Sequence, residues 1–195
     1  MFWIFIVLVA YTLGSIPVGL ILTKITGHGD LRKVGSGNIG ATNVMRVGGL
    51  RMAGLVWVLD MLKAIIAVLL GTWIAGVGFG AWCGFAAIIG HCFPIWLKFH
   101  GGKGISCLFG VLLAVNPIMF VVCGIEWLVV ALTSGKSSGG AVVVFCLMPI
   151  LGFVMSTSVG WPFLAIGILC CIRHRENIIR LLSGTESTIE WKWKK

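Results

Sequence analysis

Seven apolar runs, separated by short polar connections, make up most of the chain. They cover residues 2–22, 53–75, 78–97, 105–115, 117–132, 140–155 and 158–173. A helix needs about 20 apolar residues to cross a bilayer, so the first three runs are long enough for ordinary transmembrane helices. The next two, broken at Asn116-Pro117, must be short, tilted or re-entrant because each helical residue rises only about 1.5 Å. The pattern predicts an all-α integral membrane fold with seven transmembrane helices.

Basic residues are confined almost entirely to the connections on one side of this pattern. All of the fifteen Lys and Arg except Lys63 lie in residues 24–51, 98–104, 134–139 and 173–195. Cytoplasmic loops are enriched in Lys and Arg, so seven crossings place the N-terminus outside and the C-terminus in the cytoplasm. One long helix over 105–132 would put Lys136 outside, and we therefore favour seven crossings.

The composition agrees with a membrane protein. Hydrophobic residues make up 58% of the chain and charged residues 11%, whereas soluble domains carry about 25% charged residues. The net charge of +9 would suggest nucleic-acid binding in a soluble protein. Here it indicates membrane orientation and anionic partners instead. No polar stretch is long enough for a soluble domain, so residues 1–195 are expected to form one polytopic membrane domain.

Neither a leader peptide nor a metal site is expected. The first apolar run has no basic residue before Lys24, so it lacks the charged start of a cleavable signal and is interpreted as a retained span. The seven cysteines lie mostly in apolar stretches, where Cys behaves as a small hydrophobe. Cys170, Cys171 and His174 lack a second group with ligand spacing. We therefore expect no metal and no cofactor.

The polar segment from Asp30 to Arg46 is typical of an anion site. Glycines let backbone N–H groups turn toward a ligand, hydroxyl and amide side chains add donors, and a following helix adds its positive end. Arg46 supplies a bidentate charge. A flexible surface loop is the alternative. The candidate phosphate-binding residues of this segment are Ser36, Gly37, Asn38, Gly40, Thr42 and Asn43.

The next polar segment, residues 91–104, places Lys103 among Gly101, Gly102 and Gly104. It resembles a phosphate loop but lacks the Ser or Thr that follows the lysine of a nucleotide-binding P-loop. A cytoplasmic topology charge is the alternative reading of Lys103, and a helix-end histidine that of His91.

Two further segments complete the cytoplasmic face. Residues 133–140 offer Lys136, Ser137 and Ser138 to a phosphate, although such a stretch is often only a linker. Residues 173–180 carry His174 and Asn177 three apart on one helical face, although the segment also suits a basic membrane anchor.

Ionisable residues also occur inside the apolar runs. Asp60 and Lys63 are three apart and can pair across one helical turn, with either a functional or a structural role. Glu126 has no partner that the sequence identifies. None of the four histidines is followed by an Asp five residues later, and no Gly-x-Ser-x-Gly elbow with partners is evident, so covalent catalysis is not indicated.

In their order along the chain, these segments resemble the bacterial acyl-phosphate:glycerol-3-phosphate acyltransferase family. The resemblance rests on GSGNIGATNVMR at 35–46, FHGGKG at 99–104 and HRENIIRL at 174–181, with Asp60 and Lys63 between them. The third segment departs from the family, because Ser134 and Gly135 replace the usual Arg and Tyr. Ser106-Cys107 replaces the usual Ala-Thr, a milder departure.

The resemblance implies an enzyme of the bacterial inner membrane with its active site facing the cytoplasm. The expected reaction transfers an acyl group from acyl phosphate to glycerol 3-phosphate, without coenzyme A, giving lysophosphatidic acid and phosphate. Membrane lipid and a soluble enzyme that makes acyl phosphate are the expected partners. The expected catalytic residues are His174, Asn177, Lys103 and Arg46, and the glycines at 101, 102 and 104 join the phosphate contacts together with Ser137.

Two other functions are considered. A transporter of an organic phosphate would also use short helices and positive helix ends, but its binding groups usually lie at the middle of the membrane in corresponding broken helices of two halves. The polar segments here lie at one face. A non-catalytic scaffold leaves the Gly, Ser, Asn and Arg cluster without a purpose.

Overall fold

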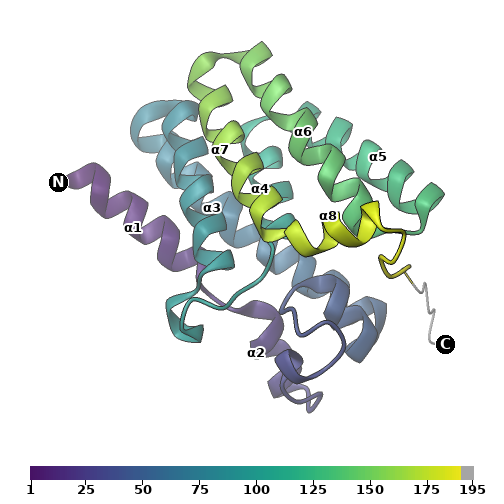
Figure 1. The fold of residues 1–195 in the computed structure, drawn as a ribbon. Helices are drawn as coiled ribbons and strands as arrows, with labels where there is room; N and C mark the ends of the chain where they lie inside the picture. Colours follow the sequence, from purple (N-terminus) through teal and green to yellow (C-terminus); the bar gives the residue numbers. More distant parts are fainter. Residues whose placement is uncertain (190–195) are drawn as a thin grey trace.

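The computed structural model describes residues 1–189, and every regular element in that part of the chain is helical (Figure 1). Three of the basic residues assigned to the cytoplasmic tail, Lys192, Lys194 and Lys195, lie outside the described residues. The helices are α1 (Phe2–Gly14), α2 (Val18–Ile25), η1 (Leu31–Lys33), α3 (Ala41–Cys92), η2 (Ile95–Leu97), α4 (Ile105–Val115), α5 (Pro117–Ser134), α6 (Ser137–Met155), α7 (Thr157–Arg173) and α8 (Arg175–Leu182).

The first apolar run is two helices rather than one. Helix α1 ends at Gly14 and α2 begins at Val18, because Pro17 lacks a backbone N–H and disfavours helical geometry at Ile16. The break frees the carbonyl of Ile16, which accepts a hydrogen bond of 2.8 Å from the Lys63 ammonium. The Val18 N–H donates to the same carbonyl at 3.0 Å, so Lys63 adds a second bond to it and connects the break to α3.

Helix α3 is a hairpin of two long arms preceded by a short first segment. Its backbone leaves helical geometry at Gly49, with φ of 80°, and again at Ala75 and Gly76, where Gly76 has φ of 81°. A Cβ on Gly71 would lie 2.9 Å from the Cα of Gly80, so the arms before and after the second break pack backbone to backbone. The chain reverses where the sequence predicts a connection.

The described part of the chain has four helical segments that are long and apolar enough to cross a membrane. They begin at Phe2, Ala41, Pro117 and Ser137, and α7 with α8 forms a fifth when this pair, bent by 66°, is taken as one span. Helix α4 is apolar but has only 11 residues. Asn116 separates α4 from α5 and caps α5, accepting bonds of 2.8 and 3.2 Å from the N–H groups of Ile118 and Met119.

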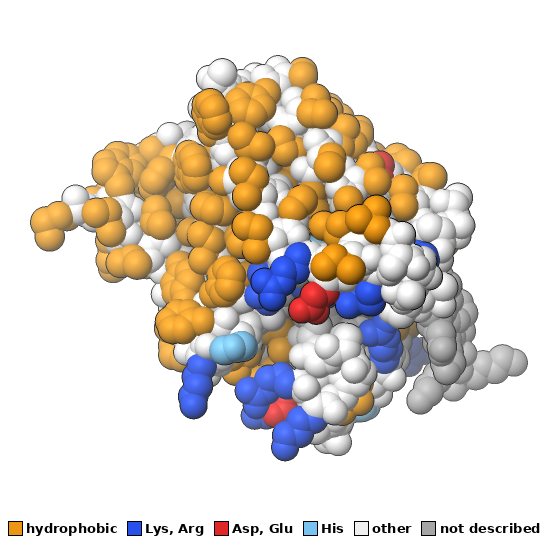
Figure 2. Space-filling view, viewed as in Figure 1, with side chains coloured by type: hydrophobic (Ala, Val, Ile, Leu, Met, Phe, Trp, Pro, Cys, Tyr) orange, Lys and Arg blue, Asp and Glu red, His pale blue; other side chains and the backbone are white. Residues whose placement is uncertain are grey.

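The helices form one packed bundle with an apolar outer surface. Helix α3 contacts α1, α4 and α7, whereas α6 packs between α5 and α7. Figure 2 shows hydrophobic side chains over the upper part of the visible face and Lys and Arg gathered from its middle, around α8, down to its lower edge. This separation is the one that a lipid layer next to a polar surface requires.

The close packing of α4 on α3 gives a test of the fold. A Cβ on Gly110 of α4 would overlap the carbonyl oxygen of Met61 in α3, so Gly110→Ala must push the two backbones apart. We expect this variant to lose about 1–3 kcal/mol, which lowers the melting temperature in detergent by roughly 3–10 °C.

Gly54→Ala is the matched control, because a Cβ on Gly54 meets nothing within 4 Å. Alanine favours a helix over glycine by about 1 kcal/mol, so this variant should melt at or slightly above the wild-type temperature. Equal melting temperatures for Gly110→Ala and wild type would contradict the packing of α4 on α3.

Candidate active site

The four polar segments meet around one cavity of about 600 Å³. Its polar part is formed by the start of α3, the loop before α4, the start of α6 and the bend between α7 and α8. Its apolar part is formed by large side chains of α3, α4 and α5, namely Trp57, Phe109, Phe120, Trp127 and Leu128. The cavity can therefore take a ligand with a charged head and an apolar chain.

Most of the residues expected from the sequence line this cavity. Those that do are Ser36, Asn38, Gly40, Thr42, Asn43, Arg46, Lys103, Gly104, Ser137, His174 and Asn177. Gly37, Gly101 and Gly102 do not line it. The structure brings the predicted segments to one cavity, and it separates residues that face the cavity from residues that shape the loops.

Asn43 organises the first loop from within. Its Nδ2 donates to the carbonyls of Leu31, Val34 and Asn38 at 2.9–3.1 Å, and its Oδ1 accepts from the N–H of Ser36 at 3.0 Å. The side chain is fully buried. Its amide is already used for four backbone bonds, so Asn43 fixes the loop instead of providing the phosphate donor expected from the sequence.

The start of α3 is left open toward the cavity. Asn38 Oδ1 accepts from the N–H of Gly40 at 2.9 Å, which fixes the turn into the helix. The first N–H groups of a helix have no acceptor inside it, and Gly40, Ala41 and Thr42 all line the cavity. An anion can bind at this helix start, with Arg46 one turn further along.

Gly101 and Gly102 hold the lysine loop against the end of α3. Their N–H groups donate to the carbonyls of Cys92 and His91 at 3.1 and 3.0 Å, and their carbonyls accept from the Arg173 guanidinium at 3.0 Å. A Cβ on Gly102 would overlap His91 Nε2, so only glycine fits there. These glycines position Lys103.

Lys103 begins a chain of hydrogen bonds across the polar part of the cavity. Its ammonium donates to Asn177 Oδ1, and Asn177 Nδ2 donates to Glu186 Oε1 at 2.6 Å. The same carboxylate accepts from Ser138 at 2.8 Å and from Arg180 Nε at 2.6 Å. Side chains of the second, third and fourth polar segments are thereby linked through one carboxylate.

The sequence indicates only a basic tail for the segment that carries Glu186. Residues 183–189 fold back over the cavity after Gly184, whose φ of 73° ends α8. The Arg180 carbonyl accepts from the N–H groups of Thr185 and Glu186, and the Ile189 N–H donates to the Gly135 carbonyl at 2.7 Å. The sequence feature that could have indicated a role for Glu186 is its negative charge within a strongly basic tail.

Lys103 and Glu186 have perturbed acidities. Burial lowers the pKa of Lys103, and the nearby Arg180 lowers it further. Burial alone would raise the pKa of Glu186, but the hydrogen bonds from Asn177, Ser138 and Arg180 outweigh it and hold this pKa below its usual range. The carboxylate therefore stays charged at neutral pH.

His174 lies in the bend after α7 with its ring against Phe145, at 5.0 Å between ring centres. Its Nδ1 is 2.9 Å from the Cys170 carbonyl, and because a carbonyl only accepts, Nδ1 carries the proton and Nε2 is the free base. Burial lowers the pKa of His174 to about 4, which keeps the ring neutral. The Cys170 carbonyl orients the ring, whereas Asn177, on the same helical face, is bonded to Lys103 and Glu186.

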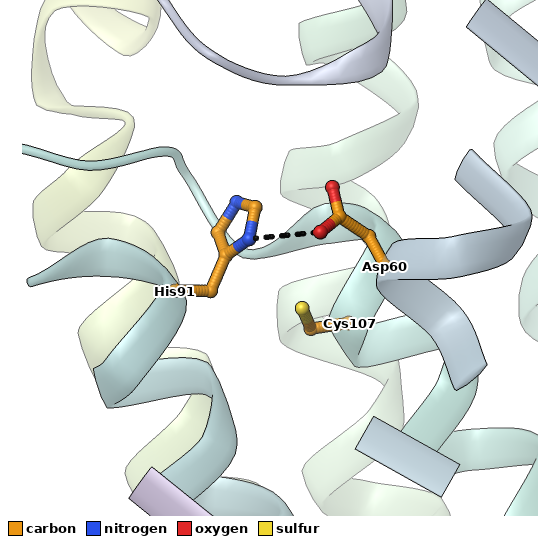
Figure 3. Close-up of side chains that lie close together, drawn as sticks. All are labelled: Asp60, His91 and Cys107. Atoms are coloured by element: carbon orange, nitrogen blue, oxygen red, sulfur yellow. Dashed lines mark ion pairs between the residues drawn. The ribbon is translucent and has the colours of Figure 1, made fainter. Parts of the chain in front are cut away.

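Asp60 and Lys63 pair beneath the cavity, as the sequence predicts. The Lys63 ammonium lies 2.7 Å from Asp60 Oδ1 and 3.1 Å from His91 Nδ1. Figure 3 shows Asp60, His91 and Cys107 pointing toward one another, with ligand-type atoms within 4.8 Å. The Lys63 ammonium already contacts two of these three side chains and supplies the positive charge, so the group does not fit a divalent cation.

Comparisons with known proteins agree on one family. The sequence model described as "Glycerol-3-phosphate acyltransferase" matches residues 4–184. Among curated proteins, the glycerol-3-phosphate acyltransferase of Sinorhizobium medicae is 45% identical over 92% of this chain and 88% of its own length. That of Rhizobium meliloti is 46% identical with the same coverage.

Solved structures give the same result. The glycerol 3-phosphate form of PlsY, described as an integral membrane glycerol 3-phosphate acyltransferase, matches with a TM-score of 0.92 and 36% identity over 97% of this chain and 96% of that one. The lysophosphatidic acid form matches with a TM-score of 0.90 and 34% identity, covering 98% of this chain and 97% of that one. The chain belongs to the glycerol-3-phosphate acyltransferase family.

Proposed function

We propose that this protein transfers an acyl group from acyl phosphate to glycerol 3-phosphate, producing lysophosphatidic acid and inorganic phosphate. The observation that carries this proposal is one cavity whose polar part holds His174, Lys103 and Arg46 and whose apolar part is aromatic. PlsY, described in a glycerol 3-phosphate form and a lysophosphatidic acid form, supports the same acceptor and product here. Membership of an acyltransferase family favours acyl transfer over transport of an organic phosphate.

The chemistry of the site suits an acyl phosphate donor. An acyl phosphate is a mixed anhydride, so its carbonyl is already activated and phosphate is a good leaving group. The enzyme must chiefly bring two phosphate-bearing reactants together against their repulsion, which requires cations, and hold the hydroxyl near the carbonyl. Arg46, Lys103 and Arg180 line the cavity and supply that positive charge.

Each side chain then has a chemical task. Ser36, Asn38 and the start of α3 bind phosphate, while Lys103 and Arg46 neutralise charge as the anhydride breaks. His174 Nε2 accepts the proton of the attacking hydroxyl, and its other nitrogen is held by the Cys170 carbonyl. The apolar part of the cavity receives the acyl chain.

We further propose seven helical crossings, with the N-terminus outside and the site facing the cytoplasm of a bacterial inner membrane. The seven are α1 with α2, the two long arms of α3, and α4, α5, α6 and α7. The cavity and the four basic segments then share the cytoplasmic side. That basic face is also where a soluble enzyme that produces acyl phosphate would dock.

The direct test mixes purified protein in detergent with acyl phosphate and labelled glycerol 3-phosphate. We expect labelled lysophosphatidic acid and one phosphate released per acyl group transferred. No product from acyl phosphate, or equal product from acyl coenzyme A, would overturn the proposed donor. A sealed vesicle is not needed for acyl transfer, whereas it is needed for transport.

Removing a cation from the cavity should stop turnover without unfolding the protein. We expect Lys103→Ala and Arg46→Ala each to lower turnover about 100-fold or more, because each removes charge stabilisation at the reacting phosphates. Melting temperatures should remain close to wild type. Lys33→Ala, which removes an exposed lysine of η1, is the control and should retain activity. Near wild-type turnover in Lys103→Ala would contradict the assigned role.

The pH profile identifies the base. Because burial lowers the pKa of His174 to about 4, the neutral ring persists to low pH, and kcat/KM for glycerol 3-phosphate should stay flat from pH 8 down to about 5. His174→Gln should lower kcat roughly 100-fold with little change in KM.

The substrate's own phosphate is the competing base. A phosphate monoester loses its second proton near pH 6, at about the value known for phosphoserine. A decline of kcat/KM as pH falls through about 6, together with unchanged kcat in His174→Gln, would assign the base to the substrate.

A further inference from the structure

Glu186 lies outside the four polar segments but supplies the carboxylate that lines the described cavity. Its side chain is only 5% exposed, whereas its partner Arg180 is 39% exposed. It accepts hydrogen bonds from Ser138 of α6 and from Asn177 and Arg180 of α8, all at 2.6–2.8 Å. A buried carboxylate with three donors is a built site, because burying the charge unpaired would cost several kcal/mol.

The bonds of Glu186 decide which way the Asn177 amide points. A carboxylate only accepts hydrogen bonds, so Asn177 must present its NH₂ group to Glu186. The carbonyl end of the same amide then faces the opposite way, toward Lys103, whose ammonium only donates. With the amide reversed, the NH₂ group would face the ammonium, and the Asn177 oxygen would face the carboxylate.

We infer that Glu186 is a positioning residue for acyl transfer, acting through Asn177 to hold the Lys103 ammonium at the cavity. The inference rests on the proposed role of Lys103 in acyl transfer. Glu186 takes no direct part in bond breaking, and it acts on Lys103 only through the side-chain amide of Asn177. The turn at Gly184 and the two N–H bonds to the Arg180 carbonyl bring the carboxylate into this position.

Exchanging the two functional groups tests this directly. In Glu186→Gln the amide at 186 no longer fixes the amide at 177, and we expect kcat to fall about 10-fold to 100-fold with KM for glycerol 3-phosphate changing less. In Asn177→Asp two carboxylates face each other, and kcat should fall at least as far.

The double variant Asn177→Asp with Glu186→Gln restores the bonding pattern. The amide now at position 186 can donate to one oxygen of the carboxylate now at position 177, and Lys103 can donate to the other oxygen. If the two substitutions acted independently, their fold losses in kcat would multiply. We expect kcat of the double variant to be at least about 10-fold higher than this product predicts. A residue needed only for folding would not show this recovery. Multiplicative losses would overturn the inference.

Glu176→Gln is the matched control, because it removes an exposed carboxylate from α8, the helix that carries Asn177. This variant should leave kcat unchanged.

A second measurement does not depend on acyl transfer. Reductive methylation with peptide mass spectrometry gives the labelling rate of Lys103 relative to Lys98, an exposed lysine of the same loop. We expect Glu186→Gln to raise this ratio several-fold, because the amine is released from Asn177, and the double variant to lower it again. An unchanged ratio would overturn the inference.

The two measurements separate the inference from the proposed function. An inactive wild-type protein would contradict acyl transfer from acyl phosphate, while the labelling ratio would still decide whether Glu186 holds Lys103 through Asn177. An active wild-type protein without recovery in the double variant would contradict the inference alone.

Discussion

Lys103 reaches the cavity because the backbone of Gly101 and Gly102, the two residues before it, packs directly against the end of α3. Their N–H groups bond to the carbonyls of Cys92 and His91, and a Cβ on Gly102 would overlap the His91 ring. His91 contacts the Lys63 ammonium, which in turn bonds to the carbonyl released at Ile16 by the break before α2. These bonds fix the relative positions of α1, α2, both long arms of α3 and the lysine loop. Arg173 attaches α7 to them by its bonds to the two glycine carbonyls.

Lys63 and Lys103 show how the surroundings of a lysine determine the role of its charge. Lys63 lies against Asp60, so the pair is close to neutral, and its ammonium also contacts the Ile16 carbonyl and His91. Lys103 is half-buried and bonded to a neutral amide, so much of its positive charge remains available to an anion in the cavity. The first lysine stabilises the packing of the helices, and the second faces the cavity.

The sequence predicts elements whose causes are local. The apolar runs, the capped break at Asn116-Pro117 and the Asp60–Lys63 pair follow from properties of neighbouring residues, and the structure contains each of them. The break at Pro17 is not in the prediction, because the high hydropathy of residues 2–22 outweighs the signal of Ser15 and Pro17 within them. The inward bonds of Asn43 and the role of Glu186 could not be predicted, because their partners are decided by how distant segments fold onto one another.

The short α4 explains why a cation and an acyl chain can share one cavity. With 11 residues at about 1.5 Å each, α4 is much shorter than the hydrocarbon layer of about 30 Å. As one of the seven proposed crossings, α4 can therefore reach the outer surface only if its start is recessed from the cytoplasmic surface, and Gly104 at that start follows Lys103 directly. Phe109, one turn further along α4, and Trp127 of α5 line the same cavity as Lys103. The cavity thus offers polar and apolar surroundings within a few residues of each other. In the proposed reaction, the reacting carbonyl joins a charged head to an apolar chain, so it belongs where the lysine loop becomes α4.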